Sequence, residues 1–250
     1  MKLSIVIPAY NEEKYLGKCL KAVFAEIEKT THEVEVIVVD NASTDKTSDV
    51  AKTFPKVKLV YEPKKGLSQA RHSGYLASNG DIIANVDSDS TIPPGWIEKV
   101  FAEFSKNSRL VALSGPYYYP EMPKLTNFFI HVYYAIGFLG HIINHHFLKV
   151  GAMLQGGNFI LRRTALEKIG GYDTSIDFYG EDTDIAVRIQ KVGLVKFVFG
   201  LKMYTSSRRF QGEGIFLTGI RYVINHFWVI IFKKPFTKKF KDIRIIEKSN

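Results

Sequence analysis

Apolar runs alternate with helix-like segments through the first ninety residues, and this alternation constrains the fold more than any other feature. Four runs have the composition of buried strands, at residues 3–8, 34–40, 57–61 and 81–87. Residues 11–28 and 67–78, which lie between these runs, are predicted to form helices, and so is a segment that Ser43 or Thr44 could cap and that reaches about residue 54. Strands that alternate with helices form βαβ units with parallel strands. We therefore expect an α/β domain with a mostly parallel, Rossmann-like sheet flanked by helices.

The length fits one large domain followed by an extension. The chain has 250 residues, enough for a full hydrophobic core, and shows neither a tandem repeat nor a low-complexity linker. We expect a catalytic domain over 1–210, divided into halves at 1–115 and 116–210. Residues 211–250 are then a basic and apolar helical extension. A single cysteine, Cys19, and a start without a signal-peptide pattern favour a cytoplasmic location.

The positive charge is concentrated near the C-terminus. Residues 196–250 contain 12 Lys and Arg but 3 Asp and Glu, whereas residues 1–195 contain 22 of each. Such an asymmetry suggests contact with an anionic surface, either a nucleic acid or a membrane. A solvated basic tail that aids solubility is the simpler alternative.

Two long apolar segments help to decide between membrane contact and a solvated basic tail. Residues 125–148 contain no Asp, Glu, Lys or Arg, and their length would allow a membrane-spanning helix. A polar stripe through Asn127, His131, His141 and His145 favours instead an amphipathic helix in a groove or a membrane interface. Residues 215–232 are also apolar, with Arg221 near their centre, and are followed by Lys233, Lys234, Lys238, Lys239 and Lys241.

An apolar helix with a basic flank is typical of membrane-surface contact. We therefore expect peripheral attachment at the inner face of the cell membrane, and no nucleic-acid partner. Packing of these segments on the catalytic domain, or on a second subunit, is the competing explanation.

The first candidate site is Asp87-Ser88-Asp89, at the end of the fourth apolar run. In a parallel sheet, ligands bind beyond the carboxyl ends of the strands. Two carboxylates separated by one residue can jointly bind a hard cation such as Mg²⁺ or Mn²⁺, which can then neutralise a diphosphate. The alternative is an ordinary turn, in which Asp and Ser are common.

The second candidate site is Glu181-Asp182, at the predicted start of a helix. Acidic residues at a helix N-terminus often do no more than cap the helix and complement its dipole. A carboxylate placed above a metal–diphosphate site can instead deprotonate an acceptor hydroxyl.

Basic residues near the same edge could bind phosphate. Arg208 and Arg209 form a pair whose guanidinium groups can contact phosphate in a bidentate manner. Lys65-Gly66 and Arg71 lie between the third and fourth predicted strands. Solvated surface residues are the alternative for the arginine pair.

Taken together and in this order, these motifs resemble glycosyltransferase family 2, with its GT-A fold, over roughly residues 1–232. Residues 4–12 are similar to the family's first strand and nucleotide-contacting loop, and residues 38–45 to the second, whose first Asp usually meets the base. Residues 66–74 resemble the helix beside the nucleotide. Asp87-Ser88-Asp89 stands at the metal-binding D-x-D, while residues 156–159 and 180–184 resemble the acceptor loop and the start of the catalytic helix.

The resemblance implies an inverting transferase that uses a UDP-, GDP- or dTDP-sugar. It assigns Asp182 as the catalytic base with Glu181 beside it, and Asp87 and Asp89 as metal ligands. Gly156, Gly157 and Asn158 are then on the acceptor side. Together with the basic residues named above, the predicted donor-binding set is Pro8, Ala9, Tyr10, Asn11, Glu12, Asp40, Asn41, Ser43, Lys65, Gly66, Arg71, Asp87, Ser88, Arg208 and Arg209. The acceptor is expected to be a glycan or lipid-linked hydroxyl or phosphate near the membrane.

The chain departs from the processive members of this family, because it has no Gln-x-x-Arg-Trp motif; residues 206–210 are only loosely similar. Two other classes stay open. A nucleotidyltransferase would usually have a Gly-rich basic loop after the first strand, whereas Tyr10-Asn11-Glu12-Glu13 is acidic. The second alternative class is a non-catalytic, membrane-associated module. The sequence names neither the sugar nor the acceptor.

Overall fold

The computed structural model describes residues 1–148, 150–237 and 242. Its centre is a seven-stranded sheet of order β3-β2-β1-β4-β8-β6-β9. These strands are β1 (Leu3–Ala9), β2 (Val34–Asp40), β3 (Val57–Tyr61), β4 (Ile82–Val86), β6 (Leu110–Ser114), β8 (Asn158–Arg162) and β9 (Leu194–Phe197). All neighbours pair in parallel except β8, which is antiparallel to both β4 and β6. The predicted mostly parallel α/β sheet is confirmed.

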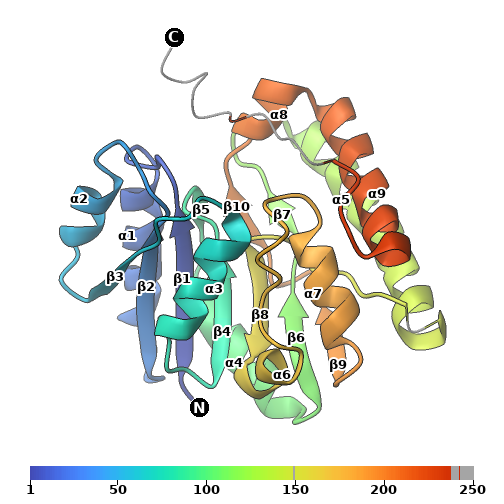
Figure 1. Cartoon of the computed structure of the whole chain (residues 1–250), viewed down its shortest axis with the longest axis horizontal. Helices are drawn as coiled ribbons and strands as arrows, with labels where there is room; N and C mark the ends of the chain where they lie inside the picture. Colours follow the sequence, from blue (N-terminus) through green and yellow to red (C-terminus); the bar gives the residue numbers. More distant parts are fainter. Residues whose placement is uncertain (149, 238–241, 243–250) are drawn as a thin grey trace.

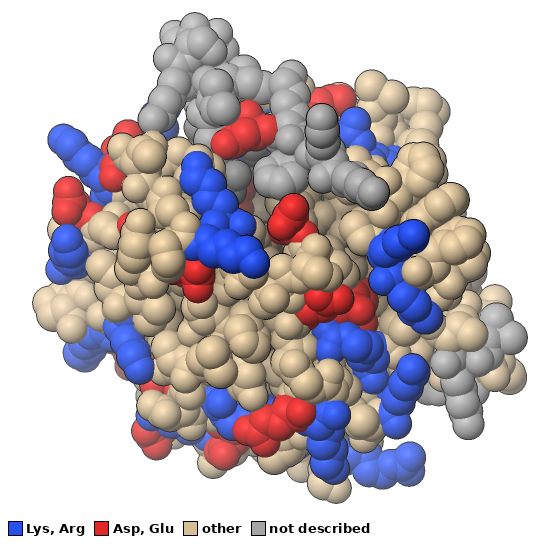
Figure 2. Space-filling model, viewed as in Figure 1, with Lys and Arg blue, Asp and Glu red and all other residues tan. Residues whose placement is uncertain are grey.

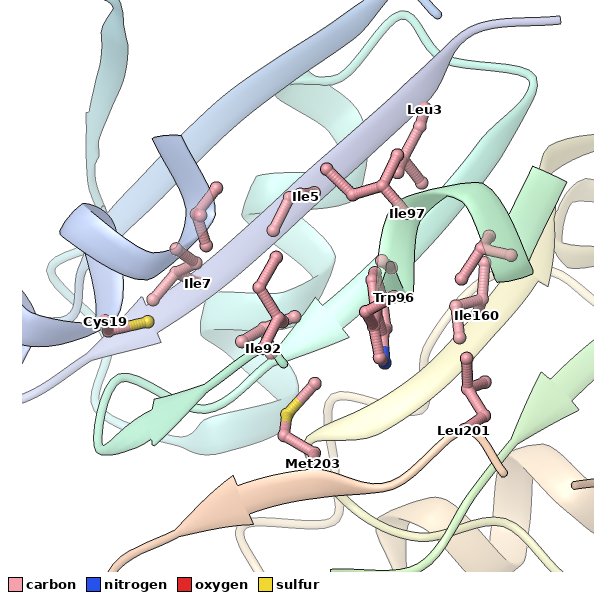
Figure 3. Close-up of a cluster of buried hydrophobic side chains, with 14 of the residues drawn as sticks. Leu3, Ile5, Ile7, Cys19, Ile92, Trp96, Ile97, Ile160, Leu201 and Met203 are labelled. Carbon is pink, nitrogen blue, oxygen red and sulfur yellow. The ribbon is translucent and has the colours of Figure 1, made fainter. Parts of the chain in front are cut away.

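Helices cover both faces of this sheet (Figure 1). The helices are α1 (Leu16–Ile27), α2 (Thr47–Lys52), α3 (Leu67–Ala77), α4 (Trp96–Lys106), α6 (Arg163–Lys168) and α7 (Glu181–Ile189). One core cluster joins β1 to α1 and α4, and the labelled side chains in Figure 3 belong to it, with Cys19 among them as a small buried residue. The second cluster joins the other face of the sheet to α3, α6 and α7.

A small second sheet lies beside the carboxyl end of β4. It consists of β5 (Ser90–Thr91), β10 (Met203–Thr205) and β7 (Tyr117–Tyr118), in that order. Ser90 Oγ donates to Thr205 Oγ1 across it at 2.9 Å. Because this sheet joins the residues after β4 to those around 117 and 204, it brings the middle and the end of the chain to the edge where β4 stops.

The remaining helices form one side of the molecule, beyond β9. They are α5 (Lys124–Ile142), which continues as the π-helical turn η1 (Ile143–Leu148), then α8 (Arg208–Glu213) and α9 (Ile215–Phe232). α9 contacts α7 and α8. The extension predicted from residue 211 thus begins within α8, and Lys238, Lys239 and Lys241 of its basic flank lie outside the described residues. The division of the catalytic domain into two halves stays a prediction.

Two predicted helices begin later than their sequence pattern suggested. The first was expected from residue 11 and begins at Leu16; the second was expected directly after a cap at Ser43 or Thr44 and begins at Thr47. The residues before each helix form loops instead, with Asn11 and Ala42 at φ of 53° and 57°. A helix cannot include a residue in this left-handed conformation, and the chain gains two polar loops at the edge of the sheet.

Candidate functional site

The carboxyl ends of β1, β2 and β4 meet at one edge of the sheet. Ala9 pairs with Asp40 in the parallel register of β1 and β2, and β4 ends one residue before Asp87. Parallel strands place their following loops at the same edge, where open α/β sheets bind ligands. The predicted site motifs from the first ninety residues therefore lie together.

The loops after β1 and β2 hold each other in place. The Asn11 backbone N–H donates to Ser43 Oγ at 3.0 Å, and Asn11 Oδ1 accepts from the Thr44 N–H at 2.8 Å. Asp40 Oδ1 accepts from the Ser43 N–H at 3.0 Å. Pro8 and Ala9 are buried in β1, so they support this loop from within.

The loop after β3 joins the same edge. Asn41 Nδ2 donates to the Lys64 carbonyl at 2.7 Å, and its Oδ1 accepts from the Gly66 N–H at 2.9 Å. Lys65 Nζ lies 2.6 Å from the Tyr10 hydroxyl and 4.3 Å from the centre of its ring. The predicted donor-side residues Tyr10, Asn41, Lys65 and Gly66 are thus brought together.

Arg71 links two of the predicted motifs. This residue of α3 is 1 % exposed. Its Nη1 donates to Glu181 Oε1, and its Nη2 donates to Asp87 Oδ1 at 3.2 Å. Asp87 and Glu181 lie 16 and 110 residues from Arg71 in the sequence. A buried guanidinium between two carboxylates compensates charge that would otherwise be costly to bury, and it fixes the two motifs relative to each other.

Tyr117 is a site residue that the sequence did not indicate. Its hydroxyl lies 2.9 Å from Asp87 Oδ2 and also contacts the Gly156 carbonyl. Gly157 packs against the same carboxylate: with a φ of 77°, a Cβ added there would lie 2.1 Å from Asp87 Oδ2. Only glycine fits this close approach. The Tyr-rich run around residue 117 carries no recognisable motif that would have revealed the contact.

Arg208 reaches the site from α8, and Arg209 does not. Arg208 Nε donates to Asp89 Oδ2 at 2.9 Å, and its Nη2 donates to Glu12 Oε1 at 2.5 Å. Its guanidinium also lies 4.5 Å from the centre of the Tyr15 ring. Arg209 instead donates to Glu213 Oε1 at 2.9 Å. The arginine pair predicted as one phosphate-binding unit is therefore divided between two surroundings.

The D-x-D carboxylates suit a cation that is shared with a ligand. The Asp87 and Asp89 side chains are 33 % and 16 % exposed, and Ser88 between them is buried. Within the described part of the chain, no cluster of three or more His, Cys, Asp or Glu could hold a metal ion. Mg²⁺ commonly binds through one or two carboxylates together with substrate phosphates. The two aspartates fit such a shared site and not an all-protein cage.

Asp182 lies at the start of α7, beside the loop of Gly156. Its Oδ2 accepts from the Gly156 N–H at 3.1 Å, and its Oδ1 from the Thr183 N–H at 2.7 Å. Burial raises the pKa of Asp182 above its ordinary 3.8, although these hydrogen bonds and nearby Arg71 oppose the rise. Burial also raises the pKa of Glu181, against the attraction of Arg71, with which it forms a buried ion pair. Carboxylates with raised pKa values are typical of acid–base sites.

The C-terminal helix borders this carboxylate. His226 of α9 has Nδ1 3.3 Å from Thr183 Oγ1. Burial lowers the pKa of His226, while Asp182 raises it. Val229 of the same helix packs on Gly180: a Cβ added to this glycine would lie 2.6 Å from Val229 Cγ2. No sequence motif pointed to His226 or Val229 as neighbours of the site.

Asn158 has a supporting position. Its Nδ2 donates to the carbonyls of Gly115 and Leu201 at 3.0 and 2.8 Å, and the residue is fully buried. Of the three residues predicted on the acceptor side, Asn158 therefore ties the loop to the interior, whereas Gly156 and Gly157 contact the site carboxylates.

Comparisons with known proteins identify the family of the chain. Residues 4–170 match the model of glycosyl transferase family 2, and residues 142–212 match a model described as the N-terminal domain of galactosyltransferase. The probable glycosyltransferase YdaM of Bacillus subtilis is 29% identical over 202 residues, which are 77% of this chain and 47% of that protein. The glucosyl-dolichyl phosphate glucuronosyltransferase of Haloferax volcanii is 26% identical over 188 residues, 72% of this chain and 59% of that one. The chain thus spans about half the length of these curated relatives.

Solved structures share the GT-A fold. The mannosyltransferase PcManGT from Pyrobaculum calidifontis, in complex with GDP-Man and Mn²⁺, aligns with a TM-score of 0.67 at 19% identity, over 98% of this chain and 68% of that one. TarS of Staphylococcus aureus aligns with a TM-score of 0.64 at 18% identity, over 83% and 37%. The family match covers most of the sheet and the loops at its carboxyl edge, and the chain belongs to glycosyl transferase family 2.

Proposed function

We propose that this protein transfers a sugar from a UDP-, GDP- or dTDP-sugar to an acceptor hydroxyl or phosphate, with inversion at the anomeric carbon. The observation that carries the proposal is the convergence at one sheet edge of the D-x-D aspartates and Asp182, linked through Arg71 and Gly156. A nucleotidyltransferase would be expected to bind phosphate through a Gly-rich loop after β1. Here the loop contains Asn11 and Glu12, which are tied to Ser43 and Thr47.

The loops after β1, β2 and β3 form the proposed nucleotide side. Asp40 and Asn41 follow β2, and Tyr10, Lys65 and Gly66 border them, so a base and ribose can bind between polar groups and the Tyr10 ring. Arg71 and Arg208, which contact Asp87 and Asp89, provide positive charge near the diphosphate. Arg209 is not expected to contact the diphosphate, because it pairs with Glu213.

Asp87 and Asp89 are proposed to hold Mg²⁺ or Mn²⁺ together with the diphosphate. The PcManGT structure is a complex with GDP-Man and Mn²⁺, and this supports a metal of the same kind here. Such a cation, when bound, offsets the negative charge that develops on the departing nucleoside diphosphate. The protein's own share is to orient the carboxylates: Arg71 and Tyr117 fix Asp87, and Arg208 fixes Asp89.

Asp182 is proposed as the base of a single displacement. Its carboxylate takes the proton of an acceptor hydroxyl while the acceptor oxygen forms a bond to the anomeric carbon. The bond from that carbon to the diphosphate oxygen breaks, and its electron pair leaves with the nucleoside diphosphate. Attack on the face opposite the leaving group inverts the configuration. Glu181, held by Arg71, positions the helix start and the acceptor.

The transfer reaction can be tested without knowing the acceptor. A set of UDP-, GDP- and dTDP-sugars is incubated with the protein and Mn²⁺, and release of nucleoside diphosphate is measured. We expect hydrolysis of one donor or a small group of donors, stopped by EDTA and restored by Mn²⁺. Release of pyrophosphate from a nucleoside triphosphate and a sugar phosphate would indicate the nucleotidyltransferase instead.

A membrane-proximal acceptor is proposed because α5 and α9 expose their apolar faces. In α5 the polar side faces inward: Asn127 and His141 are 3 % and 5 % exposed, whereas Phe129 and Leu139 are 61 % and 62 % exposed. The right edge of the molecule over these helices is mostly uncharged (Figure 2). By length and composition alone, both Lys124–His145 and Ile215–Phe232 could also cross a membrane.

A helix whose polar side faces the protein interior presents its apolar side to solvent. A large exposed apolar surface usually marks a membrane or protein contact. Lys233 and Lys234 directly follow the apolar face of α9, as expected for contact with anionic lipid. The Haloferax volcanii relative is a glucosyl-dolichyl phosphate glucuronosyltransferase, which supports a lipid-linked acceptor. We therefore propose peripheral attachment at the cytoplasmic face of the membrane.

Introducing charge on the exposed face of α9 should weaken membrane binding. Leu217 and Ile231 are 62 % and 66 % exposed, so Leu217→Glu and Ile231→Glu should leave the fold intact. Each change removes an apolar side chain worth about 1.5–3 kcal/mol when buried, so vesicle affinity should fall about tenfold or more for each. Flotation with lipid vesicles measures it.

The matched control is Leu76→Glu on α3, a leucine that is 68 % exposed and distant from this side. Vesicle binding of the α9 variants equal to that of the control would show that the face does not enter a membrane. A change of mass in sedimentation, with vesicle binding unaltered, would assign the face to a second copy of the chain.

A further inference from the structure

A groove lies at the edge of the sheet opposite to the donor site. It opens between the start of β6, the start of β9 and α6, with a volume of about 700 Å³. The parallel strands β6 and β9 begin here, whereas the D-x-D follows the carboxyl end of β4. The lining residues are therefore separate from the proposed catalytic machinery.

The charged side chains that line this groove are all basic. Arg109, Arg162, Lys168 and Lys191 contribute to its walls, and no Asp or Glu is among the lining residues. Within the described ranges, no carboxylate lies within ion-pair distance of these four cations. Several like charges around one hollow repel one another and raise the local concentration of anions.

One of these cations is held in a fixed position. Arg162 Nε donates to the Leu110 carbonyl at 3.0 Å, and its guanidinium lies 5.3 Å from the centre of the Phe104 ring. The side chain is thus preorganised at the groove wall, with less conformational entropy to lose when an anion binds.

The uncharged lining indicates which anion fits. Val111, Ala165, Val192 and Leu194 give the groove an aliphatic surface, and Ser108 and Thr164 add hydroxyls. None of the lining residues is Phe, Tyr or Trp. Proteins that bind single-stranded nucleic acids usually stack bases on aromatic side chains. A phosphate that carries an aliphatic group fits this lining better than a nucleotide.

The groove begins where the apolar surface of α5 ends. His145 of η1 belongs to its lining, and the Val195 N–H donates to His145 Nε2 at 3.3 Å. Just before it, Leu139 and Ile143 are 62 % and 52 % exposed. A basic groove that adjoins an apolar helix face combines the two surfaces to which the two parts of an amphipathic lipid bind.

We propose that this groove binds the phosphate headgroup of an anionic membrane lipid, whose acyl chains lie along the exposed face of α5 and η1. The inference rests on the membrane attachment proposed above and adds to it a headgroup site outside the catalytic centre. The groove would favour anionic over neutral membranes and would fix the orientation of the domain on the surface.

The test compares two double variants of the full chain that lose the same charge. Arg109→Gln/Lys191→Gln removes two groove cations. Lys18→Gln/Lys21→Gln removes two exposed lysines of α1, on another side of the molecule. Flotation is measured with vesicles of phosphatidylcholine alone and of phosphatidylcholine mixed with phosphatidylglycerol. Affinity for the anionic vesicles should fall about fivefold for each groove charge removed, or about 25-fold for the pair, and less for the control.

Several outcomes would overturn the proposal. Equal losses in both double variants would show that only net charge matters, and membrane attachment would still stand. Failure of the unaltered chain to bind any vesicle would remove both proposals. Binding of inorganic phosphate alone that the groove variant loses, with its affinity for anionic vesicles unchanged, would make free phosphate the ligand. Binding of a single-stranded oligonucleotide that the groove variant loses would make it a nucleic-acid site. Donor hydrolysis, measured in parallel, should be unchanged in both variants, and a loss there would instead concern the catalytic proposal.

Discussion

Asp182→Asn should lower kcat by about 10²-fold to 10⁴-fold, the usual contribution of a general base. The amide has nearly the same shape, and its oxygen can still accept the N–H of Gly156 or Thr183. The fold and the donor affinity should therefore be retained. The quantities to measure are kcat with a saturating acceptor, and donor affinity by calorimetry.

The pH dependence of the unaltered enzyme adds a second readout. A base must be deprotonated to act, and burial raises the pKa of Asp182 above 3.8. The rate should therefore fall on acidification already above this pH, and the variant should lack this limb. Asp184→Asn is the matched control on α7, because Asp184 pairs with Arg188 and not with the site. A variant at Asp182 that loses donor affinity but keeps turnover would show that its role is binding.

Asp89→Ala should abolish most activity through loss of the metal. A bound cation is worth several kcal/mol of transition-state stabilisation, so activity should fall about 10³-fold. The fold should persist, because Arg208 keeps its contacts with Glu12 and the Tyr15 ring. Binding of Mn²⁺ in the presence of the nucleoside diphosphate, followed by electron paramagnetic resonance, should weaken in parallel.

Asp81→Asn is the control for this experiment, because it precedes the same strand at the opposite edge of the sheet. It should bind Mn²⁺ and turn over donor like the unaltered protein. Full activity of Asp89→Ala in the presence of EDTA would refute a metal-dependent mechanism at this site.

The strands and the main site motifs were predictable because they depend on local pattern. Apolar runs identify β1 to β4, and parallel pairing then places Asp40 and Asp87 at one edge whatever the rest of the chain does. The antiparallel β8 was not predicted, since its direction depends on where the long segment after β6 returns to the sheet. The starts of α1 and α2 were placed too early, because Asn11 and Ala42 adopt a left-handed conformation that periodicity does not reveal.

Contacts between distant parts of the chain account for the rest of what the sequence missed. Tyr117, His226 and Val229 come from segments without motifs, and only the packing of β7 and α9 brings them to the site. The contacts of the arginine pair were also not predictable from the sequence, although the two residues are adjacent. Arg208 and Arg209 are adjacent, but consecutive residues of a helix point in directions about 100° apart. Only Arg208 reaches Asp89, and Arg209 is left to Glu213.

The position of α9 has a consequence for anyone who engineers this protein. Its apolar outer face makes the helix an obvious candidate for deletion when a more soluble form is wanted. Its inner face, however, places Val229 on Gly180 and His226 beside Thr183. Deleting Ile215–Phe232 would therefore uncover the start of α7 and lose activity for reasons unrelated to solubility. Polar replacements confined to outward residues such as Phe216 and Ile231, which are 77 % and 66 % exposed, are the safer route to crystals and assays.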